Sequence, residues 1–370
     1  MLIGLACSPV LSDAHGERLA LAAHQCTDWP ALVNQLGPHR LGPLLHWQFR
    51  QYGIPSPPEI RRTLAGMYAR QIPIAAAQQQ ALVEITRALD SEGISSVILK
   101  GGALAHTVYA EPALRPMEDL DILVRPTQLE SARQVLQDLG FSAPPPHGRF
   151  ERLMHQLPLA LRKKDGVVVA VEIHRSVLNF ALGGGPDFDH VRRPLYRYPV
   201  ADAMAQTLHP TEFLHTQLRA LRLLTDPFRA LRLADLVGWA ERMVDTIEWE
   251  RYPGMVGSLE ALNSVSAFST PLCERLGLNP DPPQGPDPSR AHYRGWPLFP
   301  FADAEGGLGK HLARTLAPPD WWSRLVYGVP SGASLTAVRW LHHPANLISQ
   351  GLRRLRLWPL NSRRFFRRRL

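Results

Sequence analysis

The sequence predicts an α+β fold in which helical regions flank a small mixed β-sheet. Helical spacing of apolar residues dominates residues 14–92 and the chain after about residue 210, whereas short β-branched runs gather in between. The 370 residues, 45% of them hydrophobic, can bury a large core and are too apolar for global disorder. We divide the chain into an N-terminal helical region over residues 1–92, a sheet-forming core over residues 93–200, a C-terminal helical region over residues 201–350 and an arginine-rich tail over residues 351–370.

The N-terminal region is expected to end in one long helix. Pro57 and Pro58 are typical of a helix start, and Gly93 is typical of a helix end. Pro73 lies between them and is expected to kink or divide the helix, because proline cannot donate a backbone hydrogen bond.

The core is expected to alternate strands and helices. Residues 95–99 (SSVIL) predict a buried strand, and the alternation DLDILV within residues 114–124 fits a strand with one polar face. An amphipathic helix is expected over residues 127–139. Two further strands, near residues 157–162 and 167–174, flank the turn sequence KKDG, whose last two residues favour a hairpin.

The C-terminal region is expected to be mostly helical. Residues 212–243 predict two helices separated near Asp226-Pro227, and the proline-rich residues 279–300 predict a linker or long loop. Residues 306–350 are expected to be helical. The buried anchors of this last segment are expected to be Trp321, Trp322, Trp340 and Leu341.

The positive charge is concentrated at the C-terminal end. The chain has 41 basic and 33 acidic residues, but eight of the arginines and no acid fall within residues 351–370. The first 350 residues are therefore neutral overall. Because the first 350 residues are neutral overall, an extended nucleic-acid-binding surface is not expected there. The arginine-rich tail could still bind a nucleic acid.

Cysteine usage and hydropathy indicate where the protein works. Cys7, Cys26 and Cys273 form no CxxC pair, which favours a reducing compartment. No segment is apolar for long enough to span a membrane, and the N-terminus lacks the basic residues of a signal peptide. We therefore expect a cytoplasmic protein without a membrane span.

The chemistry-bearing pattern is a glycine pair followed, after sixteen residues, by two aspartates. Asp119 and Asp121 are two positions apart on a predicted strand, so they share a face and repel each other unless a cation lies between them. Mg²⁺ suits such oxygen ligands and keeps phosphates in its shell. Gly101 and Gly102 end a strand and open a helix, where free N–H groups can contact a phosphate.

A third carboxylate, which would complete a two-metal clamp, is expected from the later hairpin. Glu172 is the only acid of its strand, and its apolar neighbours place it on the face opposite to the core. Such a residue can ligand metal and help deprotonate an acceptor hydroxyl. We expect His174 on the other face of that strand, as a core or supporting residue. Lys100 and Arg115 are the nearest cations in sequence and are expected to bind the triphosphate or stabilise the leaving pyrophosphate.

The stretch LKGGALAHTVYAEPALRPMEDLDILV resembles nucleotidyltransferases of the DNA polymerase β type. It is most similar to the bacterial family called uncharacterised nucleotidyltransferases. The residues that carry the resemblance are, in order, Leu99-Lys100-Gly101, Tyr109, Arg115-Pro116, Asp119, Asp121 and Val171-Glu172-Ile173-His174. The resemblance covers residues 75–240 and implies a nucleotidyltransferase core in which Asp119, Asp121 and Glu172 hold Mg²⁺ or Mn²⁺. The superfamily often has Gly-Ser at the glycine pair, whereas Gly102 leaves only backbone groups for phosphate contact.

Three functions follow from these patterns. The leading hypothesis is transfer of a nucleoside monophosphate from an NTP, expected to be ATP, to a hydroxyl or phosphate of a small molecule, peptide or protein. The resemblance to tailoring enzymes gives weak support for a peptide or metabolite. The alternatives are a toxin-like enzyme that modifies RNA or tRNA, steered by the tail, and a non-catalytic nucleotide-binding protein. His215 and Asp235 either close over the nucleotide or make structural hydrogen bonds within the helices.

Overall fold

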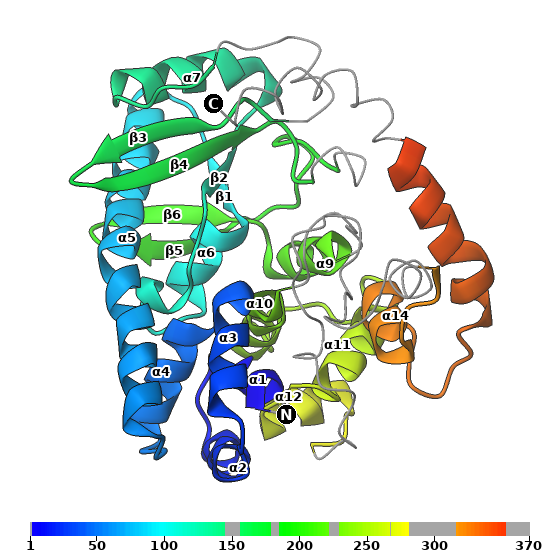
Figure 1. Ribbon diagram of the computed structural model, residues 1–370. Helices are drawn as coiled ribbons and strands as arrows, with labels where there is room; N and C mark the ends of the chain where they lie inside the picture. Colours follow the sequence, from blue (N-terminus) through cyan, green and yellow to red (C-terminus); the bar gives the residue numbers. More distant parts are fainter. Residues whose placement is uncertain are drawn as a thin grey trace.

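A computed structural model shows the predicted α+β fold, a small mixed sheet flanked by helices (Figure 1). It describes residues 2–144, 156–178, 185–221, 229–266, 268–280 and 316–352. The expected linker over residues 279–300 and the arginine-rich tail lie almost entirely outside the described residues. No helix in the described ranges is both long and apolar enough to cross a membrane.

Four strands form the main sheet in the order β1-β2-β4-β3. Their bounds are β1 (Val97–Leu99), β2 (Leu120–Leu123), β3 (Ala160–Lys164) and β4 (Val167–His174). β2 pairs antiparallel with β1 and parallel with β4, while β3 and β4 form the expected antiparallel hairpin. β2, which carries the aspartate motif, is therefore an inner strand, so its main chain is held from both sides.

A second, two-stranded sheet extends the first. β5 (Tyr196–Val200) and β6 (Ala203–Thr207) form an antiparallel hairpin that spans the position where the sequence placed a domain boundary. Thr207 Oγ1 donates to the Ile98 carbonyl at 2.6 Å, and Gln206 Nε2 donates to the Ser96 carbonyl at 2.9 Å. These two hydrogen bonds attach the hairpin to the β1 segment.

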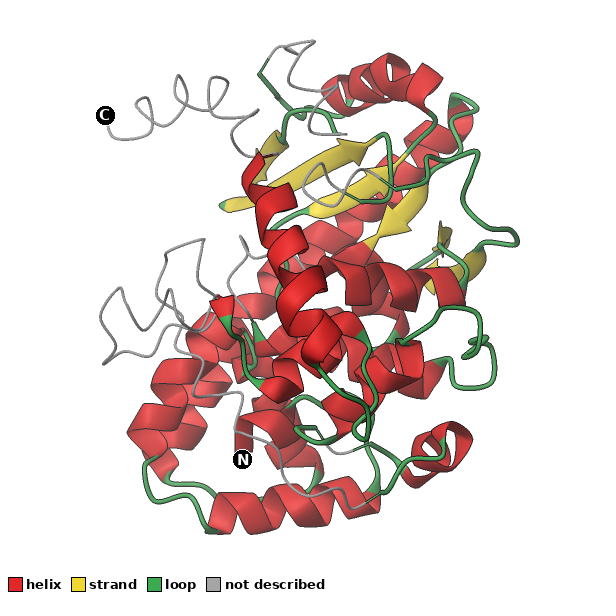
Figure 2. Cartoon of the chain, turned by 90° about the vertical axis from the view of Figure 1, so that its right-hand side faces the viewer, coloured by secondary structure: helices red, strands yellow, loops and turns green. Residues whose placement is uncertain are grey.

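Helices surround the two sheets (Figures 1 and 2). Before the main sheet come α1 (Leu2–Ala6), α2 (Asp13–His24), α3 (Trp29–His39), α4 (Gly42–Gln51) and α5 (Pro58–Ser91). Within and after it come α6 (Lys100–Thr107), η1 (Pro112–Leu114), η2 (Pro126–Gln128), α7 (Leu129–Asp138), α9 (Pro210–Ala220), α10 (Ala230–Arg242), α11 (Met255–Asn263), α12 (Thr270–Leu276) and α14 (Asp320–Tyr327).

The long helix α5 continues through Pro73, so the expected division there is wrong. Pro73 lies on the exposed side of the helix, while Gln71 and Ala75 on either side of it are buried. α5 packs against α4, β4 and the β5–β6 hairpin. This tertiary packing on both sides of Pro73 outweighs the loss of one backbone hydrogen bond.

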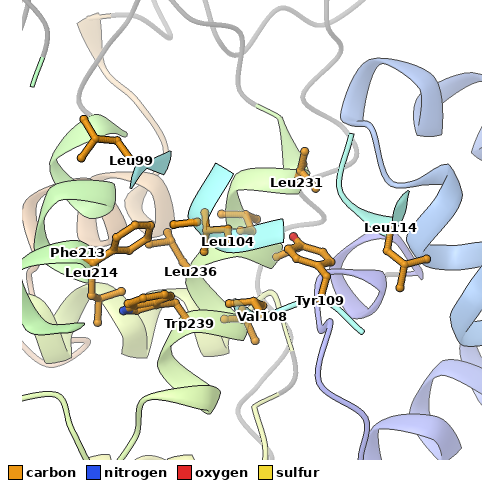
Figure 3. Packing of buried hydrophobic residues seen from close by; sticks show 14 of the residues in the cluster. Leu99, Leu104, Val108, Tyr109, Leu114, Phe213, Leu214, Leu231, Leu236 and Trp239 are labelled. Atoms are coloured by element: carbon orange, nitrogen blue, oxygen red, sulfur yellow. The ribbon is translucent and has the colours of Figure 1, made fainter. Parts of the chain in front are cut away.

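The helices α6, α9 and α10 form the core next to the motif-bearing end of the sheet (Figure 3). Phe213 of α9 stacks on Trp239 of α10 with ring centroids 4.1 Å apart. Leu104 of α6 and Val108, which follows the helix, are fully buried in the same cluster. This packing fixes where α6 begins, immediately after β1.

The C-terminal helical segment differs from expectation in the direction of its aromatic side chains. Trp322 of α14 is buried as expected, but Trp340 and Leu341 are 77% and 66% exposed, so two of the four predicted anchors are wrong. Residues 336–352 are helical with a π turn at Val338–His342, in which residues five apart share a side. Val338 and His343, five residues apart, are therefore both buried. Figure 1 shows this segment in orange-red at the edge of the molecule.

Candidate active site

Strand register brings the separate sequence motifs together on β2. Asp121 is directly opposite Leu99 of β1 on one side and Glu172 of β4 on the other. Lys100 follows Leu99 and is the first residue of α6. Its φ of 46° is in the left-handed region that non-glycine residues rarely adopt. The sheet thus places Lys100, Asp121 and Glu172 side by side.

The Asp121 carboxylate accepts two charge-assisted hydrogen bonds. Its Oδ1 atom is 2.5 Å from Lys100 Nζ and 2.8 Å from His174 Nε2. Asp121 is buried, with a side chain 4% exposed. Burial alone favours the neutral acid, but Lys100 and His174 hold the pKa of Asp121 well below its usual range. Asp121 is therefore an anion with two basic neighbours.

His174 lies on the same strand face as Glu172, so the expectation of opposite faces is wrong. Residues two apart on a strand share a face, and His174 Nε2 is 3.5 Å from Glu172 Oε2. Burial and Lys100 lower the pKa of His174, but its hydrogen bonds to Asp121 and Glu172 raise it overall. Its Nδ1 atom is buried without a hydrogen-bond partner among the described residues. The histidine belongs to the carboxylate cluster.

Asp119 precedes β2 and lines the same cleft as Asp121. Burial, followed by the negative charges of Asp121 and Glu172, raises the pKa of Asp119 to about 7. Lys100 and His174 oppose this rise without cancelling it. The site therefore holds more negative charge than its own cations neutralise, which favours an added cation or proton.

The donor set fits a divalent cation. Asp121, Glu172 and His174 each present a ligand atom, and these atoms lie within 4.8 Å of one another. Carboxylate oxygens suit Mg²⁺ and Mn²⁺, and burial together with the charges of Asp121 and Glu172 raises the pKa of Asp119 beside them. This group includes two of the three acids predicted as ligands. Asp119 is outside it, and its role as a ligand stays a prediction.

The glycine pair opens α6 as predicted, and both glycines also have close neighbours. The helix cap residue Leu99 makes no side-chain capping bond, so N–H groups of the first turn are left for another acceptor. A Cβ on Gly101 would lie 2.3 Å from Arg115 Nη1, and one on Gly102 would lie 2.8 Å from Ile98 Cγ2. Close packing therefore requires glycine here in addition to any phosphate contact.

Arg115 lies in the cleft but is engaged by Asp235 of α10. Nε and Nη2 of Arg115 donate to the two Asp235 carboxylate oxygens, each at 2.7 Å. The hydroxyl of Tyr109 donates to Asp235 Oδ1 at 2.8 Å. Of the two alternatives for Asp235, the structure thus shows a structural hydrogen-bond network. His215 stacks on Tyr252 at 3.7 Å between ring centroids and does not line this cleft.

A cleft of about 300 Å³ contains these groups together with residues that the sequence patterns did not single out. Its lining includes Lys100, Gly101, Arg115, Asp119, Asp121 and Asp235, and also Arg40, Glu118, Gln217, Arg229 and Arg232. Arg40 comes from the N-terminal helices and has no local sequence signal. Glu118 and Arg232 adjoin motifs, but nothing in the sequence indicates that they share one cleft with Arg40.

The match to a protein-family model agrees with the motifs. A family model described as an uncharacterised nucleotidyltransferase matches residues 25–268. None of the curated proteins matches the chain. Among solved structures, the chain is similar to an antigenic nucleotidyltransferase-like protein from Paracoccidioides brasiliensis, with 16% identity and a TM-score of 0.33, over 45% of this chain and 77% of that one.

Proposed function

Because the chain belongs to the family of uncharacterised nucleotidyltransferases, we propose that it transfers a nucleoside monophosphate from an NTP to an acceptor and releases pyrophosphate. The expected nucleotide is ATP. The acceptor is a hydroxyl or phosphate of a small molecule, peptide or protein. The reaction depends on Mg²⁺ or Mn²⁺, and the three free cysteines suit a reducing, cytoplasmic setting.

The observation that carries this proposal is the carboxylate cluster at the end of the sheet. Asp121 and Glu172 are register partners, and Asp119 opens into the same cleft as Asp121. The pKa of Asp119 rises to about 7 because burial, and after it the two neighbouring carboxylates, disfavour its negative charge. A fold that needed these residues only for stability has no physical reason to bury mutually repelling acids.

The residues divide the work of the reaction. A divalent cation, when bound, neutralises the phosphates and the charge that develops on the leaving pyrophosphate. Asp119, Asp121 and Glu172 would provide carboxylate oxygens for it. The first-turn N–H groups at Gly101 and Gly102 would contact the phosphates. Glu172, with a side chain 18% exposed, accepts the proton of the attacking hydroxyl. Lys100 then moves from Asp121 to the phosphates.

A direct test is pyrophosphate release from each NTP with Mg²⁺ and a panel of acceptors. We expect Asp121→Asn to lower the rate at least about a hundredfold, which corresponds to ~2.7 kcal/mol in the barrier. Mass spectrometry of the acceptor should show the addition of one nucleoside monophosphate. Asp202→Asn is the matched control, because Asp202 is an exposed partner of Arg87 far along the chain from the cluster.

Undiminished release in Asp121→Asn contradicts the proposal. Release without a mass change on any acceptor indicates hydrolysis of the nucleotide instead. Binding of nucleotide without turnover over the whole acceptor panel favours the non-catalytic alternative. The RNA-modifying alternative rests on the tail, of which the structure describes only residues 351 and 352, and tRNA therefore belongs in the acceptor panel.

A further inference from the structure

At the edge of the cleft, one carboxylate is shared by two arginines from distant parts of the chain. Glu118 Oε1 accepts a hydrogen bond from Arg40 and lies 3.4 Å from Arg229 Nη2. The two arginine side chains are only 22% and 23% exposed, whereas the Glu118 side chain is 60% exposed. The surrounding residues thus hold the two guanidinium groups in place. The more exposed Glu118 carboxylate between them is the group that can move away into solvent.

Arg40 and Arg229 are far apart in the sequence, and contacts of the neighbouring backbone bring them together. Arg40 caps the C-terminus of α3 in the left-handed conformation, with φ of 59°, and Arg229 immediately precedes α10. The N–H of Ala230 donates to His39 Nδ1 at 3.2 Å, and this hydrogen bond is buried. Because His39 and Ala230 adjoin Arg40 and Arg229, that single contact brings the two arginines together.

The pair faces the same cleft as the carboxylate cluster. Arg40, Arg229 and Arg232 line one cavity with Asp119, Asp121 and the start of α6. Arg115, the arginine predicted for phosphate contact, already makes two hydrogen bonds to Asp235. Arginine binds phosphate and carboxylate through the same planar donors, so a carboxylate between two arginines marks a place that accepts an anion.

We propose that Arg40 and Arg229 bind the terminal phosphates of the nucleotide and that Glu118 occupies their place until the nucleotide displaces it. This inference rests on the proposed function and deepens it. A polyphosphate carries more charge than one carboxylate and can engage both guanidinium groups at once. Glu118 is largely exposed, so moving its side chain into water costs little. After the reaction, the return of Glu118 helps to expel pyrophosphate.

The proposal predicts opposite effects for the two kinds of substitution. Inorganic tripolyphosphate is the probe, measured by calorimetry without metal, so that neither the cation nor the acceptor is needed. Arg40→Gln and Arg229→Gln should each weaken binding at least about tenfold, the loss expected for one charge-assisted hydrogen bond. Glu118→Gln removes the competitor and should tighten binding about three- to tenfold.

A double substitution separates displacement from general electrostatics. If Glu118 competes for the arginines, Glu118→Gln should give little gain in the Arg40→Gln background, because Arg40 makes the closer of the two contacts to Glu118. If it acts only as a distant negative charge, the gain should be the same in both backgrounds. Arg133 and Glu130 are the matched control pair, because they form an ion pair with nearly the same exposures, 22% and 69%. Arg133→Gln and Glu130→Gln should leave binding unchanged.

The proposal is overturned if both arginine variants bind tripolyphosphate as the unaltered protein does, or if Glu118→Gln binds it more weakly. It is also overturned if neither the unaltered protein nor Glu118→Gln binds tripolyphosphate. Kinetics separate it from the proposed function. If Arg40→Gln and Arg229→Gln release pyrophosphate with an unchanged KM for the nucleotide, the arginine site is contradicted and the proposed nucleotidyl transfer still stands. If tripolyphosphate binding follows the predicted pattern but no acceptor is turned over, the arginine site is supported and the proposed transfer is contradicted.

Discussion

Arg115 and Asp235 form a two-point ion pair that joins the segment before β2 to α10. Both hydrogen bonds are 2.7 Å long, and both side chains are at most 10% exposed. Asp235 also accepts from Tyr109, which follows α6. Tyr109 and Arg115 precede Asp119 in the chain, so this pair holds the backbone that leads into the carboxylate cluster.

We expect Asp235→Asn to destabilise the protein by about 3–5 kcal/mol, because it leaves the Arg115 charge buried without its counter-ion. Urea-induced unfolding measures the change. Asp202→Asn, in an exposed pair with Arg87, is the control and should show no measurable change. Unaltered stability with abolished activity in Asp235→Asn would instead show that Asp235 acts on the nucleotide.

The sequence was informative where the relevant spacing is local. Period two on a strand placed Asp121 and Glu172 on polar faces, and the structure pairs them directly. The same period of two places His174 beside Glu172, so local spacing is sufficient to predict this contact as well. Nothing local indicates that Asp235 reaches Arg115, because the two are 120 residues apart. Such contacts depend on helix packing.

The exposed Trp340 shows a second limit. An aromatic residue in a helical stretch is usually buried, but its direction depends on the helix type. The π turn at Val338–His342 changes which side chains face the body.

Arg40 shows a third limit, because its place in the cleft follows from the hydrogen bond between His39 and Ala230. Sequence spacing cannot predict contacts that tertiary packing alone creates.

Lys100→Met should tighten Mg²⁺ binding in the absence of nucleotide, by about tenfold, while it lowers turnover. The Lys100 ammonium is 2.5 Å from Asp121 Oδ1, so it competes with a cation for that carboxylate and repels it. Calorimetry with Mg²⁺ tests the first part, and pyrophosphate release tests the second. Lys163→Met, on the β3–β4 hairpin, is the control. Weaker Mg²⁺ binding in Lys100→Met would show that the lysine supports the metal site instead of competing with it.

The metal-free protein should lose stability as the pH rises from 5 to 8. The pKa of Asp119 is raised to about 7, so between its unfolded value and 7 the folded state holds a proton that the unfolded state has released. Stability therefore falls with rising pH, by at most about 1.4 kcal/mol per pH unit for one group. His174 acts in the same direction, because its raised pKa gives stability that is lost as the pH rises through the folded value.

Asp119→Asn should flatten this pH dependence, and urea unfolding in a chelator measures it. Since a cation displaces the proton, Mg²⁺ affinity should rise by about tenfold per pH unit below pH 7 and should lose this slope in Asp119→Asn. A metal-free protein that is most stable at pH 8 would contradict the charge arrangement described for the cluster.

Gly101→Ala tests whether the first glycine is kept for packing or for phosphate contact. A Cβ there would lie 2.3 Å from Arg115 Nη1, and Arg115 cannot yield while Asp235 holds it. We expect a loss of about 2–3 kcal/mol in the unaltered background and a loss smaller by at least about 1 kcal/mol in Asp235→Asn, where Arg115 is freer to move. Gly66→Ala on α5 has only Arg70 Nη1 nearby, at 3.8 Å, and should stabilise by about 0.5–1 kcal/mol. Equal losses in both backgrounds would mean that Arg115 does not limit the space at Gly101. Unchanged stability with a raised KM for the nucleotide would show that the glycine serves the approach of the phosphate.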